Sequence, residues 1–251
     1  RRVMTTKNEN KNSVIESEDD IDIRVGIDIP KPKIKIALVN IIGTSELIVH
    51  RFSEKSRKEI ADKQAKKIKT AKAKRNPNKE YEDSFYRVGE GGVDGWEHED
   101  MWDGKTTGIK AIGIKKAMVN ACRQVDNIAM TEMRGMVFIP QEYLAVEGVE
   151  PYMRTDTVRL SKGSTDLRYR PAYPVGWKIT VPIQYDEDLI SQEAITHLLM
   201  RSGFGVGLCE HRPEKNGDNG TFEVSPTPPT KEEVEKITKS IQLHKLNKSV
   251  Q

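Results

Sequence analysis

The segment 189–224 constrains the fold more than any other part of the sequence, because it combines a helix, a glycine-rich turn and a strand. Its apolar residues recur at helical spacing, and Ser191 stands before them as an N-cap. We expect the helix to end at Gly203, since glycine readily adopts the left-handed conformation that ends many helices. A glycine-rich turn and a short strand at 221–224 then follow.

The turn carries Gly205, Gly207, Gly220 and a charged tip that includes Arg212. Glycines at this density let a backbone approach a bulky partner closely, and a sugar–phosphate chain is one such partner. A flexible hairpin without any ligand explains the same spacing equally well.

The composition narrows the classes of protein to which this chain can belong. The chain has 251 residues, of which 31% are charged and 36% hydrophobic, so one domain with polar ends is expected. Cys122 and Cys209 stand far apart, and neither pairs with a histidine at metal-ligand spacing. We therefore expect a reducing compartment, the cytoplasm, with no cofactor and no membrane partner.

The expected organisation has three parts. Residues 1–30 read as a disordered acidic arm, 31–225 as the folded domain, and 226–251 as a proline linker followed by a loosely attached helix. Within the domain, strands are expected at 34–42, 136–139 and 177–185, and an amphipathic helix over 108–125. Residues 143–149 are expected to pair with the strand at 136–139. With the segment at 189–224, this order predicts an α+β fold of the split β-α-β-β-α-β, ferredoxin-like or RNA-recognition-like type, with helices on one face.

A basic helical insertion is expected at 53–75, ending at Asn76 and Pro77. Cations exceed acids by eight between Arg51 and Arg75. Such a run is usually a solvated face, but an acidic polymer would relieve its self-repulsion. Lys63, Lys66 and Lys67 are the phosphate-binding candidates here.

A long loop is expected at 151–174, where basic residues alternate with tyrosines. Guanidinium groups suit phosphates and tyrosine rings suit bases, although a plain surface loop has the same composition. The candidates are Tyr152, Arg154, Arg159, Lys162, Arg168, Tyr169 and Arg170.

The segment 81–105 is aromatic and acidic, and we expect it to form an exposed loop. Its carboxylates Asp94, Asp100 and Asp103 lie near His98, a combination that could hold a hard metal ion. Their spacing matches no ordered metal motif.

Two motifs resemble the RAMP superfamily, which includes the backbone subunits of CRISPR effector complexes. Residues 108–122 are similar to the family's loop and first helix, and residues 203–213 with 220–224 to its C-terminal glycine-rich loop. Residues 43–55 also resemble uncharacterised bacteriophage proteins found near replication and recombination genes. The resemblance implies that Gly205, Gly207 and Gly220 shape a turn against RNA or single-stranded DNA. It also implies that the 151–174 segment acts as a thumb, and that copies stack along the strand, with other effector subunits as possible partners, in a bacterial host cell.

The leading hypothesis is therefore a non-enzymatic protein that coats single-stranded RNA or DNA as a homo-oligomer. If about four phosphates are neutralised per protomer, the binding constant should fall with salt at a log–log slope near −3. The alternatives are a metal-dependent nuclease of the RAMP type, and an adaptor or inhibitor that mimics a backbone subunit.

Overall fold

A computed structural model describes residues 29–65, 74–159 and 163–249. The predictions for residues 1–28, and for Lys66, Lys67 and Lys162, lie outside these ranges. The chain divides into two units, 1–31 and 32–251, and the second contains the elements below. The strands are β1 Ile34–Gly43, β2 Leu47–Ile48, β3 Tyr86–Arg87, β4 Thr107–Lys110, β5 Val137–Phe138, β6 Tyr143–Ala145, β7 Tyr152–Arg159, β8 Thr165–Tyr173, β9 Lys178–Asp186 and β10 Phe222–Val224; the helices are α1 Glu54–Gln64, α2 Pro77–Asp83, α3 Ile112–Ala121, α4 Met130–Met136, α5 Gln192–Gly205 and α6 Lys231–Ser249.

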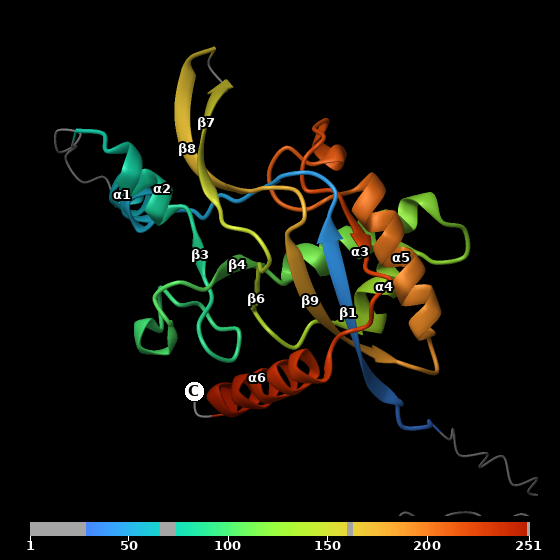
Figure 1. The fold of residues 1–251 in the computed structure, drawn as a ribbon. Helices are drawn as coiled ribbons and strands as arrows, with labels where there is room; N and C mark the ends of the chain where they lie inside the picture. The colour runs from blue at the N-terminus through green and yellow to red at the C-terminus, as the bar shows by residue number, and fades with distance from the viewer. Residues whose placement is uncertain (1–28, 66–73, 160–162, 250–251) are drawn as a thin grey trace, which may run out of the picture. The chain divides into compact units, whose positions relative to one another are not determined.

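The central sheet is antiparallel and has the strand order β10-β1-β9-β5 (Figure 1). β1 and β9 pair along almost their whole length, from Ile34 opposite Asp186 to Ile42 opposite Lys178. The four strands lie where the sequence predicts them, and the fold belongs to the α+β class.

One face of this sheet builds the core. Alternate residues of β1 and β9, among them Ile41 and Val181, are buried together with the apolar sides of α3 and α5. The amphipathic pattern at 108–125 correctly predicts a helix, although its first residues belong to strand β4. Residues 143–145 pair with β4 rather than with β5, so the expected partner was wrong.

Helix α5 begins as predicted, since the Ser191 hydroxyl accepts a hydrogen bond from the backbone of Ala194 at 3.1 Å. It continues past Gly203 and ends at Gly205, so the predicted end was wrong. A Cβ atom on Gly203 would lie 2.0 Å from the carbonyl oxygen of Phe222. Gly203 therefore serves close helix–strand packing rather than helix termination.

Residues 151–174 form a hairpin of two long strands, β7 and β8, rather than an irregular loop (Figure 1). The register pairs Tyr152 with Ala172 and Arg159 with Thr165. Strand β2 adds to the base of β8. Period-two alternation is weak here because the outer part of the hairpin has no face against the core, as the exposure of Leu167 shows.

The insertion at 53–75 contains helix α1, and a second helix follows it. Asn76 and Pro77 begin α2 rather than ending a helix, because the Asn76 side chain accepts a hydrogen bond from Lys79 N at 3.2 Å. Residues 81–105, expected to be one exposed loop, contain the end of α2, strand β3 and several buried positions.

Helix α6 makes several contacts with the rest of the described chain. Its start carries the predicted cap, in which Thr230 and Glu233 bond each other's backbone N–H groups. Asn40, which alternates with the core-facing residues of β1, bonds Glu233 at 3.3 Å. Gln141 bonds Ser240 at 2.6 Å, and Ile241 is buried. The start of helix α6 thus lies beside the second face of the sheet at Asn40. No helix in the described ranges is both long and apolar enough to cross a membrane.

Candidate nucleic-acid interface

The base of the β7–β8 hairpin is a network of paired charges around one buried arginine, Arg170. Arg170 is only 2% exposed, and its guanidinium lies 2.6 Å from Asp156 and 3.5 Å from Glu210. Arg154 bonds Asp156 at 2.9 Å and also pairs with Glu46. Burial alone would raise the pKa of Asp156, but the bonds from the two arginines outweigh it and lower that pKa. Carboxylates of the chain therefore already neutralise both arginines, which makes them poor candidates for binding a phosphate.

The glycine-rich turn packs on itself. A Cβ atom on Gly220 would lie 1.9 Å from the carbonyl oxygen of Leu208, and one on Gly205 would lie 2.5 Å from the Gln124 side chain. Gly207 and Gly220 also have φ angles of +69° and +70°, which favour glycine. The chain's own atoms therefore occupy the space that these glycines leave.

The turn also joins the hairpin base. Arg170 lies 3.2 Å from the Nε2 atom of His211, and Glu210 N donates to the Ile48 carbonyl at 3.0 Å. Arg212 bonds Glu214 at 2.9 Å and the Cys209 carbonyl at the same distance. Tyr152, another predicted site residue, bonds Glu46. The structure thus brings together the predicted residues of both segments in one network of internal contacts, in which the buried Nε atom of Arg170 has no hydrogen-bond partner.

The outer half of the hairpin differs. Arg168 is half-buried, and its Nη1 atom lies 3.4 Å from the Nδ1 atom of His50. No carboxylate of the described chain forms an ion pair with Arg168, and the same holds for the exposed Arg159 at the end of β7. Burial, and then the positive charge of Arg168, lower the pKa of His50. His50 is therefore neutral near pH 7, and the charge of Arg168 stays unmatched.

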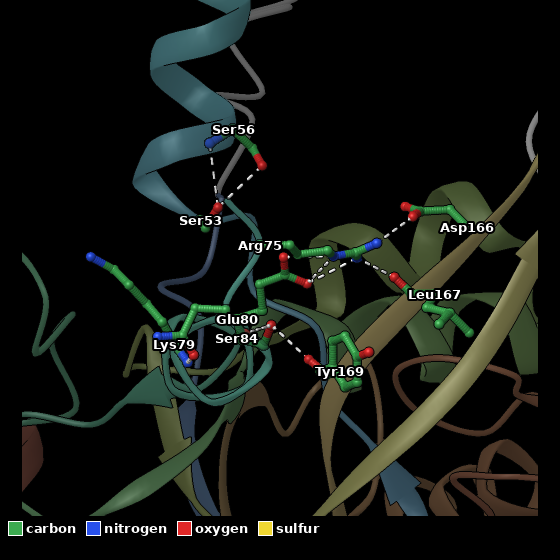
Figure 2. A network of polar contacts seen from close by, with 10 residues as sticks. Ser53, Ser56, Arg75, Lys79, Glu80, Ser84, Asp166, Leu167 and Tyr169 are labelled. Carbon is green, nitrogen blue, oxygen red and sulfur yellow. Dashed lines mark hydrogen bonds and ion pairs between the residues drawn. The ribbon is translucent and has the colours of Figure 1, made fainter. Parts of the chain in front are cut away.

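Arg168 lines a cavity of about 320 Å³ between the hairpin and the segment with α1 and α2. Figure 2 shows part of its wall, where Arg75 reaches from the start of α2 to the hairpin. Arg75 bonds Glu80 and Asp166, each at 2.7 Å, and also the Leu167 carbonyl. The two carboxylates raise the pKa of Arg75 and neutralise its charge.

Two aromatic rings line the same cavity. The guanidinium of Arg75 lies 5.6 Å from the ring centre of Tyr169, which holds that ring at the wall. Phe52 is 49% exposed and stacks on no other ring of the described residues. The hydroxyl groups of Ser53, Ser56 and Ser84 also line the cavity; those of Ser53 and Ser56 bond each other at 3.1 Å, and that of Ser84 donates to the Glu80 carbonyl at 2.6 Å. The cavity therefore combines the guanidinium of Arg168, aromatic surface and hydroxyl groups with the carboxylates of Glu59 and Asp83, which also line it.

The sequence pointed to some of these residues and missed others. It singled out Arg168 and Tyr169, but not His50, Phe52 or Arg75. The Asn76–Pro77 cap would have placed a helix start beside Arg75 and hence a fixed position for its side chain. Lys63 lies in α1, and the positions of Lys66, Lys67 and Lys162 fall outside the described ranges.

The acidic segment, a possible metal site on sequence grounds, has its carboxylates Asp94 and Asp103 bonded by the chain's own donors. Asp94 is buried and accepts a hydrogen bond from Tyr143 at 2.8 Å, while Asp103 accepts bonds from the backbone of Lys105 and Thr106. Within the described ranges, no group of three or more His, Cys, Asp or Glu side chains is placed to hold a metal ion.

The structure thus divides the predicted residues into a set that holds the hairpin base together and a set that is available to a ligand.

Comparison with family models and with curated proteins gives no match for this chain.

Proposed function

We propose that this protein binds single-stranded nucleic acid, without catalysing a reaction, along the outer half of the β7–β8 hairpin and the adjoining cavity. Arg168 carries the proposal. It is a half-buried guanidinium at a cavity wall with a neutral histidine and no carboxylate partner in the described chain. A phosphate would supply the missing negative charge and accept two parallel hydrogen bonds.

The aromatic rings that line the cavity favour a nucleotide over an isolated phosphate ion as the ligand. Phe52 and Tyr169 line the cavity that Arg168 lines, so one site offers both a cation and aromatic surface. Stacking of a base on a protein ring typically contributes about 1–3 kcal/mol and tolerates any base. Unpaired bases are needed for such stacking, which favours a single strand over a duplex.

We further propose that the domain is ferredoxin-like. The antiparallel order β10-β1-β9-β5, with α3 before β5 and α5 before β10, supports this topology. On β1 and β9, the second face of the sheet carries no aromatic ring, and the start of α6 lies beside it at Asn40. The hairpin is therefore the better candidate for the strand than the sheet face that RNA-recognition modules use.

We also propose that copies bind side by side along the strand, which is the arrangement that the RAMP resemblance implies. Both a CRISPR-like assembly on RNA and a bacteriophage protein on single-stranded DNA agree with this proposal. RNA and DNA oligomers of identical sequence, compared by fluorescence anisotropy, distinguish the two polymers.

The direct test of the site is the substitution Arg168→Gln, with Arg201→Gln on α5 as a control that removes the same charge from an exposed position. Loss of one charged contact should weaken binding of a single-stranded oligomer about tenfold in the first variant, since 1.4 kcal/mol is tenfold in affinity. The control should stay within about twofold of wild type on the same scale. Equal affinities for the two variants would refute the proposed site.

A further inference from the structure

A second and larger cavity, of about 830 Å³, lies between α6 and the segment that follows β3. Its walls are largely apolar, with Met101, Trp102 and Leu144 on one side and Ile237 and Leu243 of α6 on the other. The indole N–H of Trp102 already donates to the Thr106 carbonyl at 2.7 Å, so the ring is held in place. This cavity shares no lining residue with the one beside Arg168.

The charge of this second cavity has the opposite sign to that of a nucleic-acid site. Six carboxylates line it, against the two ammonium groups of Lys236 and Lys239. Lys236 is itself paired with Glu147 at 2.6 Å. The carboxylates of Glu90, Asp100 and Glu232 are exposed and have no cationic partner in the described part of the chain. A polyanion would be repelled here and a cation attracted.

A buried acceptor without a donor points in the same direction. Gln141 lines the cavity and is 7% exposed, and its amide N–H donates to Ser240 at 2.6 Å. Its amide oxygen has no hydrogen-bond partner. Buried polar groups are nearly always paired, so an orphaned acceptor at a cavity wall calls for an N–H donor from outside the fold.

We propose that this cavity binds a lysine-bearing segment of a partner protein. The aliphatic stem of a lysine would lie against Trp102 and Met101, while its ammonium group would meet the free carboxylates at the rim. Backbone or side-chain N–H groups of the same segment could donate to Gln141. A metal ion would make no use of the apolar walls.

The test is calorimetric titration of the full chain with a ten-residue peptide of alternating lysine and leucine pairs. A peptide with glutamine in place of every lysine is the ligand control. The double variant Asp100→Asn with Glu232→Gln removes two free rim charges, and Glu223→Gln with Asp218→Asn removes two exposed charges elsewhere. We expect the rim variant to bind the lysine peptide at least tenfold more weakly than wild type, because the loss of even one charged contact corresponds to about tenfold in affinity. The control variant should bind the peptide within about twofold of wild type on the same scale.

Three results would overturn this inference: no binding of the lysine peptide at low salt, equal weakening in both double variants, or spermidine binding as tightly as the peptide. The rim variant should retain the melting temperature and the oligonucleotide affinity of wild type, because its substituted side chains form no hydrogen bond or ion pair within the described residues and line only this cavity. Failure here would therefore leave the proposed nucleic-acid interface untouched, and the reverse also holds.

Discussion

The two halves of the β7–β8 hairpin contain the same residue types and have different roles. At the base, Arg154 and Arg170 share Asp156 and reach Glu46 and Glu210. Further out, Arg168 faces Asp156 in the strand register but forms no ion pair with any carboxylate of the described residues, and its guanidinium lies 3.4 Å from the neutral His50. A count of basic residues along the hairpin cannot separate these groups. What separates them is whether the fold brings a carboxylate to each arginine.

The partners at the base come from distant parts of the chain. Glu46 follows β1 and Glu210 lies in the glycine-rich turn, so only the tertiary fold brings them to β7 and β8. The base of the hairpin thus connects three segments of the chain, whereas the outer half of the hairpin borders the cavity beside Arg168. The experiments below are designed to break or sharpen this contrast.

The largest effect is expected at Arg170. Arg170→Met leaves Asp156 with one partner fewer and Glu210 with none, and breaking a buried ion pair typically costs about 3–5 kcal/mol of unfolding free energy. Arg168→Met, in contrast, should change that free energy by less than about 1 kcal/mol, because no ion pair is lost. Urea denaturation of both variants checks this, and similar stabilities would contradict the division of the hairpin.

A second stability experiment tests whether the glycine-rich segment serves packing. Gly203→Ala forces a methyl group onto the Phe222 carbonyl and should cost about 1–3 kcal/mol or more. Gly205→Ala meets only the flexible end of Gln124 and gains helix propensity, so it should be close to neutral, within about 1 kcal/mol.

Thermal melting of the two alanine variants distinguishes them. If Gly203→Ala melted like wild type, the close packing of α5 on β10 would not be the reason for this glycine. If instead Gly205→Ala selectively lost oligonucleotide binding while remaining stable, the turn would belong to the nucleic-acid interface after all.

A smaller effect concerns the outer half and pH. The pKa of His50 is lower in the folded state than its ordinary value of 6.5. As the pH falls below 6.5, His50 therefore takes up a proton in the unfolded chain before it does so in the folded chain. The contribution of His50 to stability is therefore complete above that pH and declines below it. His50→Gln should flatten the decline in unfolding free energy between pH 7 and pH 5, measured by denaturation at each pH. An unchanged pH profile would show that the ring is not held neutral.

Periodicity predicted the central sheet and its two helices because these elements bury one side against a common core. Pro182 shows how a local rule is met within the tertiary fold. Its missing N–H suits an edge or a bulge, yet it lies in β9 opposite Leu38. Strand β5 pairs with β9 only at Gln184 and Tyr185, so the other side of Pro182 has no ladder partner and the proline costs little.

The candidate site was predictable only in part. The sequence showed that arginine and tyrosine alternate in one segment, and Arg168 and Tyr169 do line the cavity. It could not show that Arg170, two positions away, is buried among carboxylates from other segments. It also attributed the glycines to a ligand, whereas the chain's own carbonyl groups fill the space beside Gly203 and Gly220.

The salt dependence of oligonucleotide binding tests the central claim most directly. The slope of log affinity against log salt should be compared between wild type and the double variant Arg159→Gln with Arg168→Gln. Each lost phosphate contact should reduce a negative slope by about 0.7, so the double variant should be shallower by about 1.4. An identical slope in the two proteins, or an affinity of wild type that does not change with salt, would contradict the account.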